Sequence, residues 1–190
     1  KNTVMTTISF LDADKTNKDI LFRQYISPPL LAQTIVSQTL KFQIRGAENH
    51  TGNNMFTTIH IRVVNNEGTA DVGTILVVTR DNTEVTTSLT NRQFSATTTA
   101  VTCSEGDRLV IEIGTGGDPA ATSNGHDSDL RIGDAAASDL IENDTATTDD
   151  NPWIEFVTLS LRNVDYKLVY INDKSNDTDV QYRVYKNDNG

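Results

Sequence analysis

Alternation of apolar and polar residues is the dominant pattern along this chain. Thr39–Arg45 places Leu40, Phe42 and Ile44 on one face and polar residues on the other, and Met55–Val64 repeats the pattern. A period of two is typical of a β-strand with one buried face. The same reasoning predicts further strands at Val4–Leu11, Ile20–Ile26, Leu30–Val36 (extended or irregular), Val72–Arg80, Glu84–Leu89, Arg92–Val101, Arg108–Ile113 and Trp153–Leu161.

These segments are short, are separated by turn residues, and leave no convincing helix. Roughly eight to ten such strands predict an all-β fold, an antiparallel β-sandwich of jelly-roll type, for residues 1–162. The residues expected to face the core of this sandwich are Leu40, Phe42, Ile44, Ile59, Ile61, Leu76, Val78, Leu109, Ile111, Ile113, Ile154 and Phe156.

Residues 163–190 form a second predicted unit, a C-terminal strand pair or arm. Its strands, Asp165–Ile171 and Val180–Lys186, carry apolar groups on both faces, more than a solvent-exposed hairpin needs. Because a lone two-stranded hairpin is marginally stable in water, the arm needs another surface. We expect it either to extend the chain's own sandwich or to add to a neighbouring subunit by β-augmentation, and we favour the second.

The overall charge limits the classes of partner. The net charge of −10 and pI near 4.6 argue against nucleic acid, which requires a basic surface. No apolar run approaches the length needed to span a membrane. The single cysteine, Cys103, permits no internal disulfide, and we expect it to be a small buried residue.

Gly125–Phe156 reads as one long acidic loop, a kind that is usually either functional or disordered. Four of its carboxylates could converge on Ca²⁺, which prefers oxygen ligands from a loop: Asp127, Asp129, Asp134 and Asp139. Their spacing does not match an EF-hand. The competing interpretation, which we favour, is a solvated loop without cofactor in which each aspartate makes its own local turn.

Catalytic patterns are weak, and the sequence predicts no enzyme. His126, Asp127 and Ser128 are consecutive and can hardly form the hydrogen-bonded chain of a triad. Glu112 and Glu155 could be the acid and nucleophile of a glycosidase if they faced each other across a concave sheet. Carboxylates on an outer sheet face are more often simply solvated, and we expect the same of His60.

Aromatic residues offer an alternative function. Trp153, Tyr166 and Tyr170 could stack on sugar rings, which would make the chain a secreted or cell-surface carbohydrate-binding module. Trp153 could equally fill the core, and the two tyrosines share a face with Leu168, which favours packing.

Two motifs extend the argument to a family. GDRLVIEIG, and the ordering R-I-G-D…S-D-L…N-P-W-I-E-F, lie within a stretch from Gln24 to Phe156 that resembles uncharacterised structural proteins of bacteriophages and environmental viruses. The resemblance implies a non-enzymatic structural protein on the virion surface, as capsid decoration or a tail component. Its expected partners are further copies of itself, in a homo-oligomer, and other virion proteins.

Overall fold

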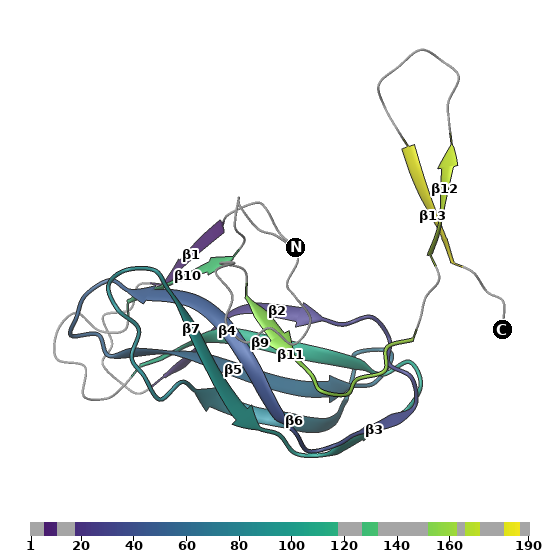
Figure 1. Ribbon diagram of the computed structural model, residues 1–190, viewed down its shortest axis with the longest axis horizontal. Helices are drawn as coiled ribbons and strands as arrows, with labels where there is room; N and C mark the ends of the chain where they lie inside the picture. The colour runs from purple at the N-terminus through teal and green to yellow at the C-terminus, as the bar shows by residue number, and fades with distance from the viewer. Residues whose placement is uncertain are drawn as a thin grey trace, which may run out of the picture.

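The computed structural model describes residues 6–10, 18–117, 127–132, 152–162, 166–171 and 181–186, the last two by their backbone alone. All regular structure in these residues is β-strand (Figure 1). The strands are β1 (Thr6–Phe10), β2 (Asp19–Ile26), β3 (Gln33–Ile35), β4 (Thr39–Glu48), β5 (Met55–Val64), β6 (Asp71–Arg80), β7 (Thr90–Thr97), β8 (Val101–Cys103), β9 (Arg108–Gly117), β10 (Ser128–Ile132), β11 (Trp153–Glu155), β12 (Tyr166–Ile171) and β13 (Gln181–Lys186).

Eight of these strands form two antiparallel sheets with the connectivity of a jelly roll. One sheet has the order β1-β10-β4-β7, and the other has the order β2-β9-β5-β6. Strand β11 continues the line of β10 along β4, and β3 pairs with β8 in a short separate ladder. Successive strands therefore cross repeatedly from one sheet to the other, as in a double Greek key. The predicted fold class is confirmed.

The core lies between the two sheets. Leu40, Phe42 and Ile44 of β4 face Ile59 and Ile61 of β5, and all five are at most 2% exposed. The rings of Phe42 and Phe94 lie 5.2 Å apart in a tilted arrangement. All but one of the remaining predicted core residues belong to the same cluster or pack against it. They are Leu76, Leu109, Ile113, and the partly buried Ile111, Ile154 and Phe156.

The exception is Val78, which is 49% exposed and was predicted wrongly. Instead, the neighbouring residues Ile75 and Leu76 are both buried. The cause is that β6 shifts register against β5 at three points. Each bulge inserts an extra residue into β6 and breaks the strict alternation on which the prediction rested.

Three predicted boundaries were also wrong. The acidic stretch is not one loop, because β10 lies inside it and pairs with both β1 and β4. The predicted strand Trp153–Leu161 shrinks to β11, after which Val157 N–H donates to the side chain of Gln38 and Ser160 N–H to that of Gln33. Residues 84–89 are not a strand.

Strands β12 and β13 pair with each other, which confirms the predicted hairpin. Tyr166 lies opposite Lys186, and Ile171 lies opposite Gln181. The two strands form a sheet of their own, separate from the sandwich sheets among the described residues. Extension of the chain's own sandwich is therefore not seen there, and pairing with a neighbour stays a prediction.

Two smaller expectations concern Cys103 and the membrane. Cys103 is buried at 3% exposure, as predicted. Within the described ranges, no helix is long and apolar enough to cross a membrane.

Candidate binding site on the outer face of one sheet

In the β2-β9-β5-β6 sheet, glycines of β9 allow neighbouring chain segments to approach β9 closely. A Cβ on Gly114 would lie 1.8 Å from the carbonyl oxygen of Ile20, so no other residue fits without moving β2. A Cβ on Gly116 would lie 2.4 Å from Nε of Arg80, which donates to Asp19 at 2.7 Å. Next to these contacts, the face of the sheet that points away from the core has a depression with Gly114 in its lining.

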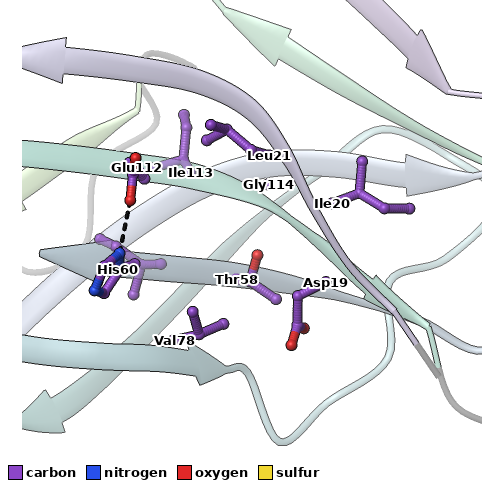
Figure 2. Close-up of a pocket in the computed structure, with 10 residues that line it drawn as sticks. Asp19, Ile20, Leu21, Thr58, His60, Val78, Glu112, Ile113 and Gly114 are labelled. Carbon is purple, nitrogen blue, oxygen red and sulfur yellow. Dashed lines mark hydrogen bonds and ion pairs between the residues drawn. The ribbon is translucent and has the colours of Figure 1, made fainter.

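This depression is a shallow pocket of about 120 Å³. Gly114 and Thr58 lie along it, Leu21 and Val78 give it apolar sides, and the polar side chains of Glu112 and His60 lie at one end (Figure 2). Ligand sites combine apolar walls with a few convergent polar groups, and this depression does so at a smaller volume than the roughly 300–1,000 Å³ of most small-molecule sites.

Glu112 is the centre of the polar end. Its carboxylate lies 2.6 Å from Nδ1 of His60 and accepts a hydrogen bond of 2.7 Å from Nε2 of Gln24. Arg62 lies 3.6 Å away and forms an ion pair with Asp71. All four strands of the sheet contribute to this network. Gln24 of β2 and His60 of β5 stand directly opposite Glu112 of β9 in the ladders, and Asp71 lies on β6.

The network holds Glu112 in its charged form. Burial alone would raise the pKa of Glu112, but the hydrogen bonds from His60 and Gln24 and the charge of Arg62 outweigh it, so the pKa lies below its ordinary value. Glu112 is therefore a fixed acceptor near neutral pH and a poor proton donor. The geometry suits binding rather than acid catalysis.

The structure corrects two sequence interpretations here. His60 and Glu112 are not independently solvated, since they bind each other. Glu112 and Glu155 do not face each other, because β9 and β11 belong to different sheets and Ile154 beside Glu155 packs against the core between them. Alternation did place His60 and Glu112 outward, but only the register between β5 and β9 brings them together.

The four aspartates predicted as Ca²⁺ ligands are only partly described. Asp134 and Asp139 lie outside the described residues. Asp127 and Asp129 flank Ser128, which is fully buried and bonded to Thr115 at 2.9 Å. Among the described residues, no group of three histidine, cysteine or acidic side chains could hold a metal ion. The Ca²⁺ site stays a prediction.

Trp153, the main glycan candidate, lies on the other sheet. It stands opposite Gln43 on β4, which in turn stands opposite Gln93 on β7 and accepts its side-chain hydrogen bond at 2.7 Å. The indole Nε1 is buried and has no hydrogen-bond partner among the described residues. Tyr166 and Tyr170 belong to the separate hairpin sheet, so the ladders do not bring the three aromatic residues together.

A buried carboxyl group, that of Glu48, was missed by the sequence analysis. Glu48 is 3% exposed, accepts a hydrogen bond from Met55 N at 3.3 Å, and is hydrogen-bonded to Glu84. Burial raises the pKa of Glu48 to about 7; the Met55 N–H opposes this effect and the charge of Glu84 adds to it. Position 48 continues the inward alternation of β4, which was the signal that could have revealed it.

Comparisons with known proteins assign no family. No family model matches the chain, and no curated protein matches it. Two solved chains, from the structures of the Gx and Gt strains of infectious bursal disease virus, match with TM-scores of 0.30 and 0.31 and identities of 12% and 13%. Each match covers 68% of this chain, which spans only 31% and 30% of those chains. Similarity this low supports no shared function.

Proposed function

We propose that this chain is a structural subunit of a bacteriophage particle, on the capsid surface or the tail, and that it assembles as a homo-oligomer without enzymatic activity. The observation that carries the proposal is the exposure of large apolar side chains on β2, an edge strand of one sheet. Leu21 and Ile26 of β2 are 56% and 60% exposed. Strand edges bearing apolar side chains are surfaces that favour pairing with another chain.

A second group of exposed apolar residues supports self-association. Residues 157–162 run beside residues 29–38, joined by the Leu30–Leu161 bridge and by the hydrogen bond from Arg162 N to the carbonyl of Pro29. Leu31, Val36 and Val157 lie exposed along these two segments. This strip ends where the chain continues toward the C-terminal hairpin.

The setting in a virion rests on two further arguments. The Gln24–Phe156 stretch resembles structural proteins of bacteriophages. The jelly roll is common among viral capsid domains, but it also occurs in lectins, so the fold supports the proposal only by analogy.

Self-association can be tested by sedimentation velocity of the intact chain over a concentration series. The proposal predicts a species larger than the 20.9 kDa monomer that increases with concentration. A single monomeric species up to roughly 100 µM, where even weak specific association would be detected, would count against it.

The second candidate function is glycan binding, and the partly exposed side chain of Trp153 favours it. Its indole ring could stack on a sugar ring. A glycan array with the intact chain tests this function. Saturable binding that is lost in Trp153→Ala, which removes the ring, would favour a carbohydrate-binding module.

A further inference from the structure

We propose that the β12–β13 hairpin of one copy pairs with the β2 edge of a neighbouring copy and so extends the β2-β9-β5-β6 sheet. This inference rests on the proposed homo-oligomer and identifies its interface. It also names the receiving strand for the arm.

The two edges of the acceptor sheet differ in how well they are protected. β6 is interrupted by three register shifts against β5, and such bulges discourage further pairing. β2 has one shift against β9, contains neither lysine nor proline, and exposes Leu21, Tyr25 and Ile26. Among the described strands, β2 pairs with β9 alone and is therefore the less protected edge of this sheet.

The hairpin supplies what such an edge requires. β12 and β13 pair only with each other among the described strands, and a two-stranded sheet is marginally stable by itself. Their sequences, YKLVYI and QYRVYK, are rich in β-branched and aromatic residues, as is common in strands. Addition to β2 would provide the third strand and cover the apolar side chains on both partners.

Charge also favours the hairpin over other parts of a second copy. β12 and β13 carry three cations, Lys167, Arg183 and Lys186, and no acidic residue. Residues 165–186 as a whole carry four cations and four acidic groups, so this segment is neutral. The whole chain has a net charge of −10, so two acidic bodies repel each other, whereas the neutral segment adds no repulsion and its cationic strands are attracted to a body.

The test compares sedimentation of the intact chain with that of three variants. Leu21→Lys/Ile26→Lys places cations on the exposed side of β2, where they should repel the cationic strands of the hairpin. Val72→Lys/Val77→Lys is the matched control on β6, where the side chains are 41% and 68% exposed. The third variant is truncated after Arg162.

We expect the β2 variant and the truncated chain to associate more than about tenfold more weakly than the intact chain, and the β6 control to associate normally. Circular dichroism of each variant checks that the sandwich remains folded. In addition, a chain with Arg23→Cys and a second chain with Lys167→Cys should be joined by a short bis-maleimide when mixed.

The outcomes separate this inference from the proposed function. Normal association of the β2 variant and absence of the mixed cross-link would overturn the hairpin–β2 contact, while the homo-oligomer would stand. If the truncated chain unfolds, the hairpin–β2 contact is tested by the cross-link and the β2 variant alone. A monomeric intact chain would instead remove the homo-oligomer itself.

Discussion

Replacement of Glu48 by glutamine should remove a large part of the pH dependence of folding stability. The folded state holds the Glu48 proton more tightly than the unfolded state does, since the pKa rises from about 4.5 to about 7. For an acid with a raised pKa, the stabilising contribution is fully present below the unfolded pKa and is lost as the pH rises through the folded pKa. The fold should therefore weaken from about pH 5 to about pH 8.

The size of the effect follows from the same values. At about 1.4 kcal/mol for each pKa unit, the gap between 4.5 and about 7 corresponds to a ceiling of roughly 3 kcal/mol, of which roughly 2.5 kcal/mol is lost between about pH 5 and about pH 8. Glutamine is uncharged, keeps an oxygen to accept the Met55 N–H, and offers an amide donor to Glu84. The Glu48→Gln variant should therefore lack this loss.

Urea unfolding followed by the fluorescence of the single tryptophan, Trp153, measures the difference. The wild-type free energy of unfolding should fall relative to that of Glu48→Gln as the pH rises. Glu105→Gln is the control, because the Glu105 side chain is 58% exposed and its loss should leave the pH profile unchanged. If the free energies of the wild type and Glu48→Gln decline in parallel, the buried-proton explanation is wrong.

Three further predictions concern the scaffold and its loops. Gly114→Ala should destabilise the fold by about 3 kcal/mol, because the new Cβ meets the backbone of Ile20. Gly68→Ala is the control: Gly68 has open space around it and a φ of 70°, so the substitution should cost only about 1 kcal/mol. Urea unfolding midpoints would show the difference, and equal costs would contradict the steric reason. Asp81→Ala should lower the free energy of unfolding by about 3 kcal/mol, since the Asp81 side chain is 1% exposed and accepts two hydrogen bonds from Arg92 at 2.7 and 2.8 Å. In the same assay, Asp71→Ala should cost under about 1 kcal/mol, because the Asp71 side chain is 60% exposed. Similar losses of stability in the two variants would refute the role of burial. If Asp127, Asp129, Asp134 and Asp139 bind Ca²⁺, chelator should lower the melting temperature and added Ca²⁺ should restore it, and an unchanged melting temperature would favour the solvated interpretation.

Hydrophobic alternation predicted the parts of the fold in which both partners of a ladder are regular. β4, β5 and β9 were found because their inward residues repeat every second position without interruption. β10 also alternates, with Ser128, Leu130 and Ile132 buried, but Asp129 and the surrounding acidic sequence made it resemble a loop. The acidic composition around β10 led to the prediction of a loop, although the alternation of a strand was present.

Other features could not be predicted because they depend on the pairing of distant residues. The bulges of β6 arise from its register with β5, so nothing within β6 indicates that Val78 turns outward while Ile75 is buried. The contact between His60 and Glu112 joins residues 52 positions apart and requires the register of β5 against β9. The glycines at positions 114 and 116 were local indications of a close approach at this face.

The central claim is that the chain is a structural component of a phage particle, and the composition of intact particles tests it most directly. Purified particles from the source of this sequence would be analysed by peptide mass spectrometry and labelled with antibodies to the purified chain for electron microscopy. We predict peptides of the chain in many copies per particle and regular labelling of the particle surface. Particles that contain no peptide of the chain and remain unlabelled would contradict the claim.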